Sequence, residues 1–155
     1  MALERRAGLT LGAATLTTGL LAGLYYAYSC SVMPGLGRTD DHTFVEAMRA
    51  INEAILNPAF FLTFVGAPLA TAIVAFRERH EGGTARRLVL IALGLHVLAF
   101  LSTSAINVPL NDELARTGHR AAFEGAWVAG NILRTVAVTG AFACLVARLR
   151  TPSSR

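Results

Sequence analysis

The residue in this sequence best suited to chemistry is an arginine within an apolar stretch. Arg134 is the only charged side chain among the 23 residues from Gly125 to Ala147. An arginine near the centre of a membrane helix costs roughly 2.5–3.5 kcal/mol, so it normally faces a polar partner or a wet cavity. None of the apolar stretches contains an acidic residue that could serve as a counter-ion. An unpaired guanidinium of this kind suits an anionic ligand or a developing oxyanion.

Other polar side chains share a helix face with Arg134. Asn131 lies one turn before it, Trp127 lies one turn earlier still, and Glu124 precedes the apolar stretch. Residues three and four apart lie above one another on a helix. Two interpretations remain open. Trp127 and Asn131 are either an interfacial aromatic and an interhelical hydrogen-bonding residue, or parts of one polar site with Arg134.

A second polar motif, Asn-Val-Pro-Leu-Asn, covers residues 107–111. Proline removes a backbone donor and disfavours helix at the residue before it, so the helix is predicted to stop or unwind at about Asn107. Asn107 and Asn111 then either cap helix ends, with Asn111 opening a short helix over 112–116, or point their amides into the bundle. Both interpretations remain open.

The elements that must position these residues are long apolar helices. The chain is 54% hydrophobic and only 15% charged, whereas a soluble domain is roughly 25% charged. Four windows are free or nearly free of charge: Ala7–Gly37, Ala54–Phe76, Leu88–Asn111 and Gly125–Ala147. Each can cross about 30 Å of hydrocarbon as a helix. The sequence therefore predicts an all-α bundle of four transmembrane helices, a single domain over 1–150, followed by a disordered tail over 151–155.

An additional amphipathic helix is predicted between the first two spans, from about Asp41 to Leu56. Its apolar residues recur at helical spacing: Phe44, Met48, Ile51 and Ile55. Its polar residues are His42, Glu46, Arg49, Asn52 and Glu53. We expect this helix to cover the outer mouth of the bundle as a lid.

Some residues are expected to have structural roles. Tyr25, Tyr26 and Tyr28 fit interfacial anchors, although one of them could equally point inward as a donor. His96 is expected to be a hydrogen-bonded core histidine. The two cysteines, Cys30 and Cys144, fall at opposite ends of the bundle, too far apart for a disulfide, and both are expected to be small buried residues.

The arginines predict the orientation in the membrane. The chain has 14 arginines and no lysine. Nine lie in the N-terminal tail, the loop 77–87 and the C-terminal tail, and four lie in the other two loops. Positive charge concentrates on the cytoplasmic side. We therefore expect a multi-pass protein of the plasma (inner) membrane with both termini in the cytoplasm. The arginines form no basic stripe, so no nucleic-acid partner is expected.

Together the two polar motifs carry a resemblance. Asn-Val-Pro-Leu-Asn followed by Trp-x-x-x-Asn-x-x-Arg is similar to the anthrone-oxygenase-like family of small four-helix membrane proteins, whose bacterial members were long described as a domain of unknown function. Pro34 and the run Met48-Arg49-x-x-Asn52 extend the resemblance over most of the chain. It implies a monooxygenase-type insertion of oxygen into polyketide anthrones, giving anthraquinones without bound flavin or haem.

This chemistry needs an oxide cradle, an aromatic wall and a base. An anthrone methylene is acidic because its carbanion delocalises into an aryl oxide, and that anion can react with dioxygen directly. The predicted catalytic residues are Arg134, Asn131, Asn107, His42 and Glu124, and the predicted substrate-binding residues are Trp127, Asn111, Arg49 and Asn52. The base remains open among four residues of the outer loops: His42, Glu46, His119 and Glu124.

Two other functions remain open, and the sequence alone does not decide whether the protein is an enzyme. One is a metal-dependent membrane oxidase with copper or iron held by His42, Glu46, His119 and Glu124. The other is a non-catalytic accessory or binding subunit in which the Arg134 network only specifies packing. Under the oxygenase hypothesis we expect no cofactor. The expected partners are membrane lipid, a hydrophobic aromatic small molecule and further copies of the chain in a homo-oligomer.

Overall fold

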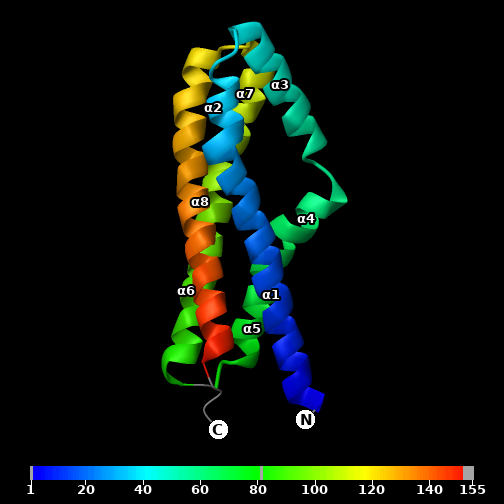
Figure 1. The fold of residues 1–155 in the computed structure, drawn as a ribbon, viewed down its shortest axis with the longest axis vertical. Helices are drawn as coiled ribbons and strands as arrows, with labels where there is room; N and C mark the ends of the chain where they lie inside the picture. The colour runs from blue at the N-terminus through cyan, green and yellow to red at the C-terminus, as the bar shows by residue number, and fades with distance from the viewer. Residues whose placement is uncertain (1, 81, 152–155) are drawn as a thin grey trace.

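The chain folds into an all-α bundle of four long helical segments. The computed structural model describes residues 2–80 and 82–151. In that part of the chain there is no strand, and the long segments run side by side along the molecule (Figure 1). They are Gly8–Leu36, Pro58–Arg77, Gly83–Thr117 and Arg120–Arg150, each long and apolar enough to cross a membrane. The predicted four-span helical architecture is confirmed.

Several of these segments consist of consecutive helices. The first contains α1 (Ala2–Ala27), the π-helical turn η1 (Tyr28–Val32) and α2 (Met33–Leu36). The second contains α4 (Pro58–Phe64) and α5 (Gly66–Arg77). The third contains α6 (Gly83–Ser102), the π-helical turn η2 (Thr103–Asn107) and α7 (Val108–Thr117). The fourth is the single helix α8 (Arg120–Arg150), and α3 (Asp41–Ala54) lies between the first two segments.

Both π-helical turns end two residues before a proline, Pro34 or Pro109. A proline ring collides with the carbonyl four residues earlier, and a wider π turn gives it room without ending the helix. The bonds that close the two turns run from Met33 N–H to Tyr28 O and from Val108 N–H to the carbonyl of the first η2 residue. The sequence predicted that the third helix stops or unwinds at about Asn107; it unwinds locally into a π turn, and only the predicted stop is wrong. The helix widens there and continues as α7, and no separate helix begins at 112.

The predicted amphipathic helix is present as α3. Asp40 is its N-cap and accepts a hydrogen bond from the Thr43 N–H at 3.0 Å. Its apolar face buries Phe44, Val45 and Met48, and it packs mainly on α7. In Figure 1 it lies at the end of the bundle away from both termini, called the distal end below. After α3 the chain bends, and α4 begins at Pro58.

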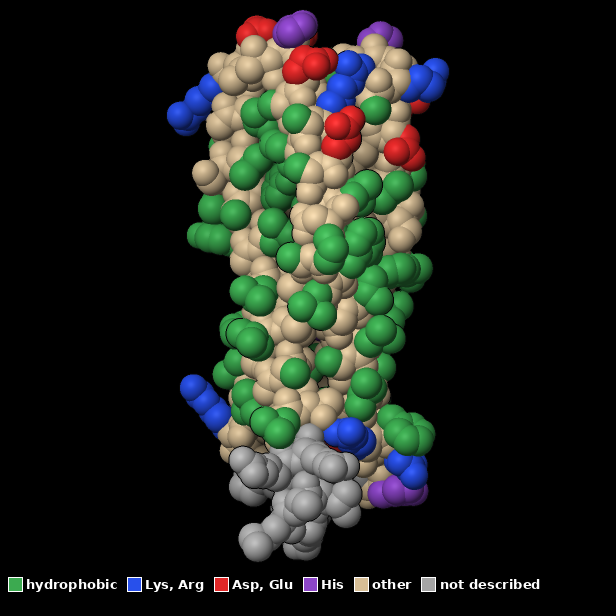
Figure 2. All heavy atoms as spheres, turned by 90° about the vertical axis from the view of Figure 1, so that its right-hand side faces the viewer, with side chains coloured by type: hydrophobic (Ala, Val, Ile, Leu, Met, Phe, Trp, Pro, Cys, Tyr) green, Lys and Arg blue, Asp and Glu red, His purple; other side chains and the backbone are tan. Residues whose placement is uncertain are grey.

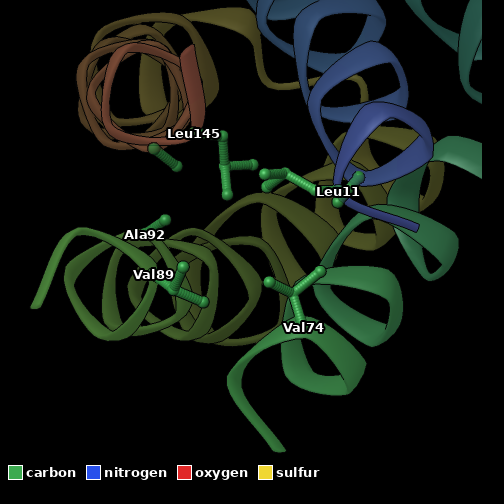
Figure 3. Packing of buried hydrophobic residues seen from close by; sticks show 7 residues of the cluster. Leu11, Val74, Val89, Ala92 and Leu145 are labelled. Carbon is green, nitrogen blue, oxygen red and sulfur yellow. The ribbon is translucent and has the colours of Figure 1, made fainter. Parts of the chain in front are cut away.

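The end of the bundle near the termini, called the proximal end below, has a close-packed apolar core. Leu11, Val74, Val89 and Leu145 point toward one another between α1, α5, α6 and α8 (Figure 3). At this end a buried ion pair joins Arg148 of α8 to Glu78, with 2.9 Å between Nη2 and Oε1. Glu78, the C-cap residue of α5, therefore supplies a carboxylate that fixes α8.

The surface is that of a multi-pass membrane protein. Figure 2 shows hydrophobic side chains over the middle of one face and charged side chains gathered at its two ends. Many of the exposed large side chains in the spans are apolar, among them Leu16, Phe76, Leu101 and Val136. Unpaired apolar surface on this scale is stable where lipid covers it.

The start of the C-terminal tail and both cysteines lie in the described part of the chain. Of the tail 151–155, only Thr151 is among the described residues, and its N–H donates to Arg148 O; residues 152–155 lie outside them. Both cysteines are free, as predicted. Cys30, however, is exposed rather than buried, because its side chain leaves η1 on the outer surface of the bundle, and Cys144 is half-buried.

Candidate functional site

A cavity of about 280 Å³ lies in the distal half of the bundle, bounded on one side by the bend between α3 and α4. Its volume is near the lower end of the roughly 300–1,000 Å³ typical of small-molecule sites. Apolar walls come from three segments: Leu24, Ile55, Leu56, Phe60, Phe61, Phe64 and Val108. Polar and aromatic side chains complete the lining: Tyr25, Tyr28, Asn52, Thr103, Asn107, Asn111, Asp112, Trp127, Asn131 and Arg134.

Arg134 is buried in the wall of this cavity, with 6% of its surface exposed. Its Nη2 donates to Asn131 Oδ1 at 2.9 Å, and its Nη1 makes a long contact of 3.4 Å to Thr103 Oγ1. Aromatic rings flank the guanidinium, with the Tyr25 centroid at 4.7 Å and the Trp127 centroid at 5.3 Å. Within the described residues no carboxylate forms an ion pair with it. The positive charge is thus held by amide, hydroxyl and π electrons alone.

Asn131 fixes Arg134 relative to the first segment. Its Nδ2 donates to the Tyr25 backbone carbonyl at 3.0 Å and to Ser29 Oγ at 2.8 Å, while its Oδ1 accepts from Arg134. All of its side-chain hydrogen-bonding groups are therefore in use. The amide joins α8 to the first segment and holds the guanidinium in one orientation.

The asparagines of the third segment fix Trp127. Asn107 Nδ2 donates to the Trp127 backbone carbonyl at 3.1 Å, and Trp127 Nε1–H donates to Asn111 Oδ1 at 2.8 Å. A Cβ added at Gly130 would lie only 2.7 Å from Asn107 Oδ1, so only a glycine allows this approach. The indole is tilted against the Tyr28 ring, with 5.5 Å between centroids. These bonds hold the indole as one wall of the cavity.

Three buried polar atoms around the cavity have no hydrogen-bond partner in the described part of the chain. They are Tyr25 Oη, Asn107 Oδ1 and Arg134 Nε. Buried polar atoms are nearly always paired, so each exception needs a physical explanation. Three exceptions on residues that line one cavity point to a polar ligand, or to water that a ligand displaces.

Comparison with known proteins gives one match. The family model described as anthrone oxygenase matches residues 53–144, which is more than half of the chain. The chain belongs to the anthrone oxygenase family. No curated protein and no solved structure matches it. The matched range of this anthrone oxygenase family member includes α4, α7 and the cavity-lining part of α8, whereas Tyr25 and Tyr28 lie outside it.

Nine site residues were predicted for this anthrone oxygenase family member, and six of them line the cavity: Asn52, Asn107, Asn111, Trp127, Asn131 and Arg134. Arg49 lies outside. Its Nη2 donates to Ala115 O at 2.7 Å near the C-terminus of α7, and its Nη1 pairs with Glu46 at 2.9 Å. Unpaired carbonyls at a helix C-terminus attract cations, so Arg49 fastens α3 to α7.

The residues expected as base or metal ligands also lie outside the cavity. His42 and Glu46 line a shallow groove on the distal surface, and His119 is exposed just before α8. Glu124 accepts from Arg120 Nε at 2.8 Å. Among the described residues, no three His, Cys, Asp or Glu side chains are grouped so that they could hold a metal ion. His96 is a core histidine, as expected, with Nε2 3.1 Å from a threonine hydroxyl of α1.

Three polar residues of the cavity lining were not among the predicted site residues: Tyr25, Tyr28 and Asp112. Tyr25 and Tyr28 lie in it, so two of the three tyrosines face inward and only Tyr26 is exposed. Asp112 is the one carboxylate among the described lining residues. It was missed because the helix was expected to break before it. The continuous π-to-α path of the third segment is what turns Asn111 and Asp112 toward the cavity.

Proposed function

We propose that this protein oxidises a flat, enolisable aromatic of the anthrone type with dioxygen, inside the distal cavity. The observation that carries the proposal is the state of Arg134. A buried cation without a carboxylate partner lies between two aromatic rings at a cavity lined largely by apolar side chains. A ligand that is apolar over most of its surface and gains negative charge on one oxygen fits both features.

Arg134 would act on the transition state. When the methylene carbon of an anthrone loses a proton, the negative charge moves onto the carbonyl oxygen on the opposite side of the central ring. A fixed donor that already points at that position stabilises the charge without reorganising at the moment of reaction. Asn131 holds the guanidinium in place from one side. The Nε–H, which donates to none of the residues that the structure describes, is then the donor left for the oxide.

The oxidation balances without another reactant. One oxygen atom of dioxygen becomes the new ketone oxygen, and the other leaves as water together with the two methylene hydrogens. The substrate supplies all four electrons, so no external reductant enters the balance. The proposed reaction therefore needs no resident cofactor from this chain, only a base, an oxide-binding group and access for dioxygen.

Asp112 is the proposed base. It lines the cavity, is exposed to solvent and is not engaged in any ion pair with the described residues. Its carboxylate accepts the methylene proton and can release that proton to water at the distal surface. None of the residues that the sequence left open as the base lines the cavity, so the proposed site is built without His42, Glu46, His119 and Glu124.

We infer that the protein lies in the plasma (inner) membrane with both termini in the cytoplasm, because the arginines concentrate at the proximal end. The cavity then opens in the outer half of the bilayer. The test is labelling of a cysteine introduced at Arg79 in a variant that lacks Cys30 and Cys144. An impermeant thiol reagent added to intact cells should not label it, and labelling would reverse the orientation.

The catalytic proposal is tested with purified protein, anthrone and isotopically labelled dioxygen. The expected result is one dioxygen consumed per anthrone, one labelled oxygen in the quinone, and a rate that persists after metal removal with a chelator. Heat-denatured protein in the same detergent gives the background of spontaneous oxidation. A rate equal to that background would refute the proposal, and loss of activity that returns with copper or iron would replace it with the metal-dependent oxidase.

A further inference from the structure

The phenol of Tyr25 is a buried polar group that the proposed reaction has not yet used. The residue is 4% exposed, and it lines the cavity. Its Oη is buried and makes no hydrogen bond of normal geometry with the described residues, although the Thr103 and Arg134 side chains lie near it. Leaving a buried hydroxyl unpaired costs free energy comparable to a lost hydrogen bond, so a phenylalanine would fit the apo-protein better. The hydroxyl therefore needs a reason outside the protein's own packing.

Tyr25 is held close to Arg134 by shared contacts. The Arg134 guanidinium carbon lies 4.7 Å from the Tyr25 ring centroid. Asn131 binds the backbone carbonyl of Tyr25 through Nδ2 and the guanidinium of Arg134 through Oδ1. One amide thus fixes both residues, which come from different helical segments. The result is two unpaired buried donors, Tyr25 Oη–H and Arg134 Nε–H, beside one cavity.

We propose that Tyr25 is a second catalytic donor. Its hydroxyl donates to the same carbonyl oxygen of the substrate as Arg134 and stabilises that oxygen as an oxyanion. This inference rests on the proposed function for the reaction but makes a separate claim about binding. The cavity selects aromatic ligands with an ionisable oxygen at one edge, such as phenols and enols, and favours their anionic form. Ring hydrocarbons without that oxygen bind through the apolar walls only.

The test measures the ionisation of a bound phenol. The probe is 2-hydroxyanthraquinone, whose absorption changes when the hydroxyl ionises. It is titrated with purified protein in detergent, and anthracene, which has no oxygen, is the control ligand. The variant is Tyr25→Phe, which keeps the ring beside Arg134. The control variant is Tyr26→Phe, because Tyr26 is adjacent in sequence, 61% exposed and outside the cavity lining.

Wild type should lower the pKa of the bound phenol relative to empty micelles. Tyr25→Phe should raise it again by about one to two pH units, the effect of one hydrogen bond to a charged group, and Tyr26→Phe should match wild type. Anthracene should bind equally to all three proteins. In the anthrone assay, kcat of Tyr25→Phe should fall on the order of 100-fold with little change in KM.

A structural role for the hydroxyl gives different results. Because Tyr25 Oη makes no hydrogen bond of normal geometry with the described residues, Tyr25→Phe should not lower the thermal unfolding midpoint of the apo-protein. A lower midpoint, or weaker anthracene binding, would overturn the inference by showing that the hydroxyl supports packing. Equal phenol pKa values in wild type and Tyr25→Phe would also overturn it. If wild type oxidises no anthrone, the reaction proposal fails, while the phenol titration still decides the role of Tyr25.

Discussion

Replacing Arg134 by methionine should separate the activity of this protein from its stability. Methionine has a similar length and no charge. Placing the arginine in the bilayer interior costs about 3 kcal/mol. The hydrogen bond to Asn131 at 2.9 Å returns about 1.5–3 kcal/mol, and the two ring contacts return about 0.5–1 kcal/mol each. These terms nearly cancel, so Arg134→Met should change the free energy of unfolding by less than about 2 kcal/mol.

The effect on turnover should be much larger. Loss of one preorganised donor to a developing oxyanion reduces kcat by on the order of 100–1000-fold. Arg134→Lys should recover only part of this, because an ammonium cannot reproduce the fork that donates to Asn131 and keeps Nε–H free for a ligand. Oxygen consumption with anthrone gives kcat, and thermal unfolding in the same detergent gives stability.

Arg148 provides the matched control. It lies on the same helix and is also 6% exposed, but it pairs with Glu78, whose side chain is 14% exposed. Removing one partner of a buried pair costs about 3–5 kcal/mol, and partial solvation of Glu78 places this pair near the lower end of that range. Arg148→Met should therefore destabilise the fold and leave turnover per folded molecule unchanged. If Arg134→Met unfolds the protein as Arg148→Met does, or keeps full turnover, Arg134 serves packing and the accessory-subunit function is the better one.

Three further predictions concern the surroundings of the cavity. Gly130→Ala would place a Cβ 2.7 Å from Asn107 Oδ1, so it should lower the free energy of unfolding by about 1–3 kcal/mol and reduce turnover. Gly125→Ala is the control, because a Cβ there meets nothing within 4 Å, and it should change neither. Equal unfolding midpoints for the two variants would contradict this prediction. Asp112→Asn should reduce kcat by on the order of 100-fold or more, and an unchanged kcat would exclude Asp112 as the base. Hydrogen bonds from the hydroxyl and N–H of the threonine three residues on hold the pKa of Asp40 below its ordinary value. Its contribution to stability is therefore present above the ordinary pKa and lost as pH falls through the lowered one. Thermal unfolding in acid should show this loss in wild type and not in Asp40→Asn, and parallel curves would refute it.

The broad architecture was predictable because it follows from local properties of the chain. Four apolar windows with no charged residue except Arg134 can only be helices in a bilayer, since each backbone polar group must be paired within its own segment. The amphipathic period from Phe44 onward predicted α3, whose N-cap in the structure is Asp40. The importance of Arg134 was also visible, because an ionisable residue in such a window requires polar surroundings.

The position of the third segment's polar residues could not be derived in the same way. The proline rule predicted a break at Asn107, but a π turn absorbs the proline and the helix continues. Which outcome occurs depends on packing against α8, where Gly130 permits the close approach of Asn107. A one-residue change in helical register rotates every later side chain by about 100°. Asp112 therefore lines the cavity, although the sequence analysis had placed it in a separate short helix that begins after Asn111.

The sequence by itself thus determined the number of spans, the amphipathic helix α3 and the need for a polar site around Arg134, because these depend on transfer free energies and periodicity along one segment. Only the tertiary structure decided the membership of that site. Tyr25 comes from the first segment and Asp112 from the third, and Arg49 and Glu124 are drawn away by α7 carbonyls and Arg120. Each of these outcomes depends on how separate helices rotate against one another, and no single segment encodes that rotation.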